Sequence, residues 1–495
     1  LTAPTRVQQL AVPRIMDGSD VFVKSHTGSG KTLTYLVPVV NSLLSRASRV
    51  SRGDGTMAVI VAPTRELISQ IFNVVQRVLR PFPWLVATSI TGGEKRKSEK
   101  ARLRKGAAVV VATPGRLLDH LQHTESFNTK GVEVLVLDEA DRLLDMGFAA
   151  QLEGIFDALA TSRHHALQTV LCSATITQPV RDLAAKYLQD PVTINADEGQ
   201  AAGAGNALPT PRALTQYFAL VPTKWRLVTL LALLRQQLAA AAKTIVFFST
   251  CDSVDFHHNI ISQLWASLAA DGVFGVAEAG TPSLYHLHGN LPQHVRAATI
   301  KGFATGPGSV LFATDVAARG LDLPVVQVIV QMDPPTETTE YVHRVGRTAR
   351  LGKSGKSVLF LAPSESGYLE TLAGYGVEVK PLKTDQLLAA LVGVKPTAPP
   401  KPVRALLDSA AQAASRGESQ KATERYAVAW QNTCEHLVET DGKLGEQAPS
   451  AFQAFVRAYA CHEKSTRHVF HVRSLHLGHV AKSFGLKQQP TALVG

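Results

Sequence analysis

The chain has 495 residues, 45% of them hydrophobic, and its 51 Lys and Arg against 40 Asp and Glu give a formal net charge of +11. This length accommodates about three domains that each bury a core. The sequence has no uncharged apolar run of about 18 residues and begins without a secretory pattern, which argues against a membrane span and against secretion. Four scattered cysteines fit a reducing compartment, and the positive charge favours a polyanionic partner.

A glycine-rich turn follows the first apolar segment, VFV. Residues 24–32 read KSHTGSGKT. Such a turn presents backbone N–H groups to the phosphates of a nucleotide, and the Lys31 ammonium adds positive charge. Ser25 departs from the strict pattern, which has a small Gly or Ala at that position. The segment predicts a phosphate-binding loop that leads into a helix.

Several later apolar runs also end in small, hydroxyl or basic residues. These ends are APTREL (62–67), ATPGRL (112–117) and CSAT (172–175), and Thr91-Gly92-Gly93 adds a turn with exposed backbone. Ligands of open α/β sheets bind beyond the carboxyl ends of the strands. We therefore expect these ends to converge on one edge of a parallel sheet.

The segment VLVLDEADRLL (134–144) is the strongest single signal. Its apolar half predicts a strand buried on both faces, and Asp138-Glu139-Ala140-Asp141 follow at the carboxyl end of that strand. Acidic residues at a strand end are ordinary by themselves. Combined with the phosphate loop, they predict an ATP site.

These motifs and a second set after residue 240 resemble those of DEAD-box RNA helicases. The first set starts at PTRVQ (4–8), and the second comprises VFFST (246–250), QHVR (293–296), ATDVAARGLD (313–322) and HRVGRTAR (343–350). The resemblance covers about residues 1–370. It implies an α/β fold of two tandem RecA-like parallel-sheet domains plus a mainly helical C-terminal extension.

Composition suggests the domain boundaries. Strand-like and helix-like segments alternate over residues 1–195, and a bridge rich in Gly, Ala and Pro follows at 196–213. Alternation resumes over 214–370, the second RecA-like domain. Residues 371–495 are expected to hold a linker and a helical, basic extension.

The resemblance implies how ATP and Mg²⁺ are held. Gln8 is expected to read the adenine edge with its amide. Thr32 and Asp138 are expected to hold Mg²⁺, the latter through water because Mg²⁺ dehydrates reluctantly, and Glu139 to orient or deprotonate the attacking water. The residues expected to bind nucleotide are Gln8, Thr27, Gly28, Ser29, Gly30, Lys31, Thr32 and Asp322.

Phosphoryl transfer is largely positioning and charge stabilisation, so positive charge is needed beyond the γ-phosphate. The resemblance assigns this role to Arg347 and Arg350, expected on one side of a helical turn and acting as arginine fingers. Ala349 stands where many members have Gly, and no loss is expected because Ala costs little on a helix. Coupling of hydrolysis to interdomain closure is implied for Asp141, Ser173, Thr175 and His343.

The resemblance also implies contacts to the RNA sugar-phosphate backbone, across both domains on the face opposite the ATP cleft or beside it. Few of these positions could read a base edge, so the core is not expected to select a sequence. They are Pro63, Thr64, Arg65, Gly92, Gly93, Thr113, Arg116, Gly289, Gln293, Arg296, Thr314 and Asp315.

Residues 451–486 are similar to the C-terminal extension of nucleolar DEAD-box helicases, closest to the branch linked with early large-subunit assembly. This implies ribosomal precursor RNA as substrate, proteins of the pre-ribosomal particle as further partners, and the nucleolus within the nucleus as location. The Lys and Arg residues at 464–487 predict a basic surface that touches RNA or the helicase core. Because structural zinc sites prefer paired cysteines, no zinc is expected at Cys461 and the nearby histidines.

Two function classes stay open on the sequence. One is an RNA-stimulated ATPase that separates short duplexes when closure bends one strand; the other is an ATP-gated RNA clamp or assembly scaffold. A DNA helicase is a weaker third. Every motif residue precedes Gly352, so ATP hydrolysis is expected to survive removal of residues 393–495.

Overall fold

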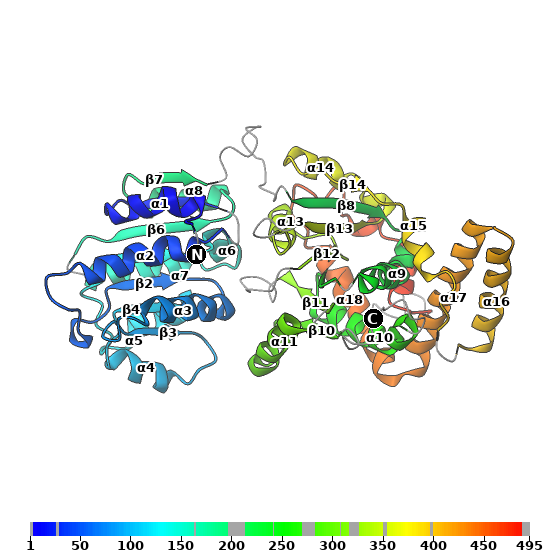
Figure 1. Cartoon of the computed structure of the whole chain (residues 1–495), viewed down its shortest axis with the longest axis horizontal. Coiled ribbons are helices and arrows are strands. Elements are labelled where there is room, and N and C mark those ends of the chain that lie inside the picture. Colours follow the sequence, from blue (N-terminus) through cyan, green and yellow to red (C-terminus); the bar gives the residue numbers. More distant parts are fainter. Residues whose placement is uncertain are drawn as a thin grey trace. The chain divides into compact units, whose positions relative to one another are not determined.

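The structure is a computed structural model that describes residues 3–25, 29–162, 165–196, 213–240, 242–269, 283–306, 308–315, 326–349, 354–396 and 399–487. These residues form two compact units (Figure 1). The first contains the described residues up to 196 and is drawn in blue to green. The second contains those from 213 onward. Apart from its first and last residues, the predicted linker 196–213 lies outside the described residues.

The first unit is built on a parallel sheet in which each strand is a short apolar run. The spatial order is β3 (Ala87–Ile90), β4 (Val109–Ala112), β2 (Ala58–Val61), β5 (Val134–Leu137), β6 (Gln168–Ser173), β1 (Val21–Lys24) and β7 (Val192–Asn195). All neighbouring pairs are parallel, with Val21 opposite Val170 and Val134 opposite Gln168. The order places the ends of β1, β6, β5 and β2, which carry predicted motifs, next to one another.

Alternate residues of these strands enter two hydrophobic clusters, one on each face of the sheet. Val59 and Val61 belong to one cluster, whereas Ala58 and Ile60 belong to the other. This follows from the period of two in a strand, and explains why the strands read as continuous apolar runs. The covering helices are α1 (Arg6–Met16), α2 (Lys31–Leu44), α3 (Arg65–Leu79), α4 (Arg96–Arg104), α5 (Pro114–His123), α6 (Ala140–Asp145), α7 (Ala149–Ser162) and α8 (Gln178–Tyr187), with the 3-10 turn η1 (Arg52–Asp54).

The second sheet repeats the first. Its spatial order is β10 (Leu284–Leu287), β11 (Val310–Thr314), β9 (Thr244–Phe248), β12 (Val328–Gln331), β13 (Gly355–Leu361), β8 (Leu214–Leu220) and β14 (Lys380–Pro381). Adding seven to each strand number of the first sheet, β3-β4-β2-β5-β6-β1-β7, gives this order. The two units therefore share one topology, as the predicted tandem arrangement requires, and the α/β fold class is confirmed.

Helices cover the second sheet and continue into the C-terminal extension. Those among the described residues are α9 (Arg226–Ala239), α10 (Cys251–Ala269), α11 (Gln293–Thr305), α13 (Thr338–Val345), α14 (Tyr368–Gly374), α15 (Thr384–Leu388), α16 (Lys401–Ser415), α17 (Ser419–Thr440), α18 (Gly442–Tyr459) and α19 (Leu477–Ser483), with 3-10 turns η2 (Thr223–Trp225), η4 (Pro363–Glu365), η5 (Ala389–Leu391) and η6 (Val472–Ser474). No described helix is long and apolar enough to cross a bilayer.

The extension packs into the core of the second unit. In Figure 1, α17 and α18 lie beside α9 and α10, and these helices are in contact. Trp430, Phe452 and Phe484 are buried in the same cluster as Val246 of β9 and Phe256 of α10. The rings of Phe256 and Phe484 are 5.6 Å apart. The extension is thus part of the second unit's hydrophobic core.

Candidate ATP and RNA sites

The predicted phosphate loop connects β1 to α2. Gly30 stands before the first residue of α2 with φ 98°, and a Cβ there would lie 2.7 Å from the Gln8 Nε2 atom. Only glycine tolerates both this positive φ and the lack of space for a side chain. Lys31 is 8% exposed, and its ammonium donates to the Ser25 carbonyl over 2.7 Å. Thr27 and Gly28 lie outside the described residues.

A buried network links the phosphate loop to the end of β5. The Tyr35 hydroxyl donates to Asp138 Oδ2 over 2.8 Å, and the Glu139 amide donates to Asp138 Oδ1 over 2.9 Å. Burial raises the pKa of Asp138, while the nearby Lys31 ammonium acts in the opposite direction. Asp138 is therefore a desolvated carboxylate beside a cation. Tyr35, one turn after Lys31 on α2, was not predicted.

Glu139 occupies a strained backbone conformation at the start of α6. Its φ is 54°, in the left-handed region that non-glycine residues rarely adopt. Arg142 Nη1 lies 3.5 Å from Glu139 Oε2, and the Arg142 side chain is 0% exposed. This guanidinium has no hydrogen-bond partner among the described residues. The Arg142 guanidinium therefore lies beside the Glu139 carboxylate at the start of α6.

Asp141 joins the acidic motif to the end of β6. Its Oδ2 accepts from the Thr175 amide at 2.9 Å and from the Thr175 hydroxyl at 2.8 Å. The Ser173 hydroxyl donates to the Thr175 carbonyl over 2.7 Å, and the Ser173 carbonyl accepts from the Ser25 amide at 3.0 Å. The residues predicted to couple hydrolysis to closure in the first unit thus form a chain of hydrogen bonds that reaches the phosphate loop.

Gln8 lies on α1 against the phosphate loop. Its Oε1 accepts from the Thr5 amide at 3.0 Å, and its Nε2 donates to the Gly30 carbonyl over 3.2 Å. Beside it is an open cavity of about 500 Å³ with mainly apolar walls, lined by Ala3, Pro4, Gln8, Gln9, Val12, Pro13, Leu33 and Val37. The cavity suits a flat base. In this conformation, however, the Gln8 side-chain amide is hydrogen-bonded to Thr5, before the first residue of α1, and to Gly30 of the phosphate loop.

The predicted RNA contacts of the first unit lie together. Except for Thr64, which starts α3 by accepting from the Leu67 amide at 3.3 Å, all of them line one open cavity of about 460 Å³. The lining residues are Pro63, Arg65, Gly92, Gly93, Thr113, Gly115, Arg116, Asp119 and Phe148. The segments that follow β2, β3 and β4 therefore meet at this cavity.

The two glycines in this cavity make room for an arginine. A Cβ on Gly92 would lie 2.8 Å from Arg65 Nη2, and one on Gly93 would lie 2.5 Å from Arg65 Nη1. The Arg65 guanidinium therefore lies directly over the glycine turn, and Gly93 also has a φ of 98°. The arrangement presents a cation and exposed backbone side by side, a combination suited to a phosphate.

Beneath the cavity lies a buried carboxylate that sequence reasoning missed. Glu99 is 0% exposed; its Oε1 accepts from the Thr91 amide at 3.1 Å, and its Oε2 lies 3.1 Å from His120 Nε2 and 3.4 Å from Arg116 Nε. Glu99 thus connects the glycine turn to the helix that carries Arg116. Its position in a basic stretch of α4 gives no sequence signal for this role.

In the second unit, the predicted RNA contacts fall in two places. Gly289, Gln293 and Arg296 lie at the turn after β10 and the first turn of α11, where Gly289 and Gln293 are exposed. Thr314 ends β11. The Asp315 carboxylate forms a bidentate ion pair with Arg344, at 2.6 Å to Nε and 2.7 Å to Nη2. Sequence reasoning missed Arg344, which is buried and also donates to the Asp333 carbonyl over 2.6 Å.

The arginine-finger segment differs from its predicted conformation. Helix α13 ends at Val345, and Ala349 has a φ of 55°, in the left-handed region. The prediction that Ala349 lies on a helix, where Ala costs little, was therefore wrong. Alanine there costs about 1 kcal/mol against glycine. Arg347 and His343 are buried, whereas Arg350 and Asp322 lie outside the described residues.

The extension contacts the helix that leads to Arg347. The Glu463 carboxylate accepts from the Thr338 amide at 3.1 Å and from the Thr338 hydroxyl, at the first residue of α13. The Glu463 amide donates to the Thr336 carbonyl over 3.0 Å. A carboxylate at a helix N-terminus stabilises that helix, so the extension supports the start of α13.

Comparison with known proteins agrees with this geometry. A family model described as DEAD/DEAH box helicase matches residues 5–183, and the helicase conserved C-terminal domain matches residues 225–352. The DEAD-box ATP-dependent RNA helicase 17 of Oryza sativa subsp. japonica is 38% identical over 99% of this chain and 87% of its own length. The chain belongs to the DEAD-box helicase family.

Further similarities cover the extension and the fold. The model of the ATP-dependent rRNA helicase SPB4-like C-terminal extension matches residues 441–492. The ATP-dependent DNA helicase DDX31 of Homo sapiens is 40% identical over 100% of this chain, which spans 60% of the length of that relative. The S. cerevisiae Dbp5 structure bound to RNA and ADP BeF3 aligns with a TM-score of 0.62 at 25% identity, covering 78% of this chain and 91% of that one.

Proposed function

We propose that this chain is an ATP-dependent RNA helicase that hydrolyses ATP when RNA is bound and locally remodels structured RNA. One observation carries the proposal: the ends of four neighbouring strands bring the Lys31, Asp138 and Glu139 site and the Arg65 cavity to the same sheet of one unit. The two sites can influence each other through the sheet, because β5, which leads to Asp138, pairs with β2, which leads to Arg65.

The reaction assigned to the first unit is attack by a water oxygen on the γ-phosphorus. The bond from that phosphorus to the bridging oxygen breaks, giving ADP and phosphate, and the water proton passes to Glu139. Lys31 neutralises the outer phosphates. Thr32 and Asp138 would hold Mg²⁺, which supplies charge stabilisation to the phosphates when bound. The hydrogen bond between Tyr35 and Asp138 keeps that carboxylate aimed at the loop.

The substrate proposed is ribosomal precursor RNA, and the location the nucleolus. The likeness of residues 441–492 to the C-terminal extension of an rRNA helicase supports this choice. The exposed side chains of Lys464, Arg467, Arg473, Lys482 and Lys487 also support it, because Lys and Arg bind phosphates with release of counterions. These five residues are named the basic tail surface.

Strand displacement with matched RNA and DNA duplexes tests the proposal. ATP-dependent separation of a short RNA duplex is expected, with little activity on DNA of the same sequence. Faster separation of the DNA duplex would instead favour the activity in the name of the human relative. ATP-dependent retention on RNA without separation would favour a clamp.

Arg347→Ala is expected to lower RNA-stimulated ATP turnover by about a hundredfold or more, the scale of a missing arginine finger. ATP binding, measured with a fluorescent nucleotide, should stay unchanged because the phosphate loop lies in the other unit. Arg416→Ala, at the exposed residue that follows α16, is the matched control. Turnover by residues 1–210 alone equal to that of the whole chain would contradict a site that needs both units.

Charge reversal on the basic tail surface is expected to weaken RNA binding. Lys482→Glu with Lys487→Glu should reduce the slope of log affinity against log salt by about 0.7 for each single-strand phosphate that the variant no longer neutralises. Both side chains are exposed, so folding should be unaffected, apart from the ion pair of Lys487 with Glu439 at 2.9 Å. Lys421→Glu on α17 serves as control. An unchanged slope would mean that this surface does not meet RNA.

A further inference from the structure

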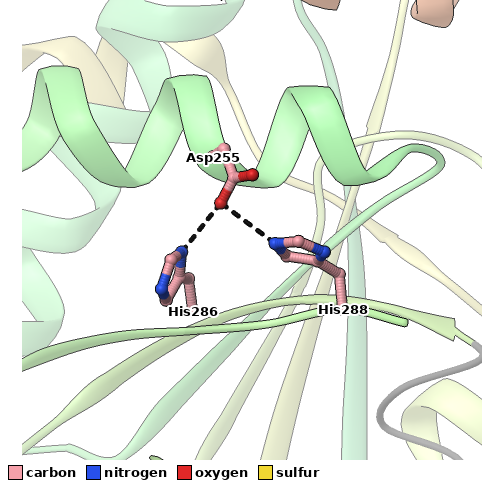
Figure 2. Close-up of side chains that lie close together, drawn as sticks. All are labelled: Asp255, His286 and His288. Carbon is pink, nitrogen blue, oxygen red and sulfur yellow. Dashed lines mark hydrogen bonds and ion pairs between the residues drawn. The ribbon is translucent and has the colours of Figure 1, made fainter. Parts of the chain in front are cut away.

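Three side chains of the second unit point at one another from two neighbouring elements (Figure 2). Asp255 comes from α10, and His286 and His288 come from β10 and the residue that follows it. Residues two apart along an extended chain project to the same side. Both imidazoles therefore face α10, where the Asp255 carboxylate lies between them.

The donor atoms are close enough for one ion. Asp255 Oδ1 is 2.8 Å from His286 Nδ1 and 3.0 Å from His288 Nε2, and all three atoms lie within 4.8 Å of one another. Zinc bonds to imidazole nitrogen and carboxylate oxygen are about 2.0–2.2 Å long. Tetrahedral ligands at these bond lengths lie about 3.4 Å apart, so the Asp255 oxygen and each imidazole nitrogen need to separate by about 0.5 Å.

The surroundings fit a metal site with access from solvent. The His288 side chain is 4% exposed, whereas those of His286 and Asp255 are 30% and 32% exposed. The His286 ring is also stacked on His258, with centroids 4.5 Å apart. Two imidazoles and one carboxylate are the protein ligands of many zinc sites with open positions, and they suit Mg²⁺ poorly.

We propose that Asp255, His286 and His288 bind a divalent transition-metal ion of the Zn²⁺ class. Within the described part of the chain, no other group of three or more metal-ligating side chains is this close together. The site is separate from the Mg²⁺ position proposed at Asp138, and it changes the expectation that the protein binds no zinc. An ion there would fix β10 to α10 directly before Gly289, so it would order the turn that leads to Gln293 and Arg296.

The same three residues also contact one another without an ion. Both imidazoles lie within hydrogen-bonding distance of Asp255 Oδ1, so an ion that enters the site must replace these two contacts.

Zinc binding by the untagged full chain tests the proposal, after removal of metals with a chelator and in the absence of ATP and RNA. Calorimetry with ZnCl₂ should show one site, and Co²⁺ should give visible absorption bands that ZnCl₂ removes. Because neither ATP nor RNA is present, the result is independent of the proposed helicase function.

His286→Arg is the decisive variant, because it keeps a hydrogen-bond donor beside Asp255 but removes a metal ligand. It should weaken zinc binding by about a hundredfold, at the upper end of what altered metal-site residues cost, while leaving the melting temperature of the metal-free protein nearly unchanged. Asp255→Asn should weaken binding similarly, and His468→Gln in the exposed tail should leave it unaltered. No zinc binding by the wild-type chain, or equal binding by His286→Arg, would show that the three residues form a hydrogen-bonded ion cluster only.

Discussion

Glu139→Gln is expected to bind ATP and RNA normally but to hydrolyse ATP at least about a hundredfold more slowly, the scale of a lost general base. The amide keeps the shape of the side chain at its unusual φ of 54° but cannot accept the proton of the attacking water. Phosphate release at saturating RNA measures the rate, and a fluorescent nucleotide measures binding.

Lys31→Ala is the contrasting variant, and its defect should be in nucleotide affinity itself. The Lys31 ammonium lies at the phosphate loop and donates to the Ser25 carbonyl, so its removal takes away both charge and loop order. The two variants should therefore separate binding from chemistry. Wild-type hydrolysis by Glu139→Gln in the presence of RNA would remove Glu139 from the mechanism.

A chain that ends at residue 392 is expected to have a misfolded second unit and no RNA-stimulated ATP hydrolysis. From the sequence alone, hydrolysis is expected to survive, because all motifs precede the cut. However, Trp430, Phe452 and Phe484 are buried in the core of that unit. Each such side chain contributes about 1.5–3 kcal/mol by burial, and a domain has only about 5–15 kcal/mol of net stability. Glu463 would also be missing from the start of α13.

Thermal unfolding and limited proteolysis measure this effect. A chain that ends at Lys487 is the control, since it keeps every aromatic residue of the shared core, and Phe484→Ala is the single-site version, expected to cost about 3–5 kcal/mol. A soluble, cooperatively folded chain 1–392 with normal ATP turnover would show that the extension is an independent module.

Much of the fold follows from local sequence patterns. Runs such as VLVL are apolar on both faces, which only a sheet covered on two sides can bury, and the clusters on opposite faces show that outcome. The glycine spacing before Lys31 likewise predicted the loop. The convergence of Arg65, Gly93 and Arg116 followed from the general rule for strand ends in parallel sheets.

Other parts of the site depend on contacts that sequence patterns do not encode. Tyr35 meets Asp138 across 103 positions of the chain, and the buried Glu99 gives no sign of its role in a stretch that otherwise reads as a solvated basic helix. The left-handed conformation of Ala349 depends on where α13 ends, and an alanine does not indicate such a conformation. The sequence of the tail shows which of its residues are apolar, but it does not indicate which surface those residues pack against.

The rate of ATP hydrolysis by the full chain as a function of RNA concentration tests the central claim most directly. We expect a low basal rate that rises and saturates with single-stranded RNA, and a rate for Glu139→Gln that stays near the basal value at every concentration. Equal rates for the wild-type chain with and without RNA, at ATP concentrations that saturate the site, would contradict RNA-dependent hydrolysis.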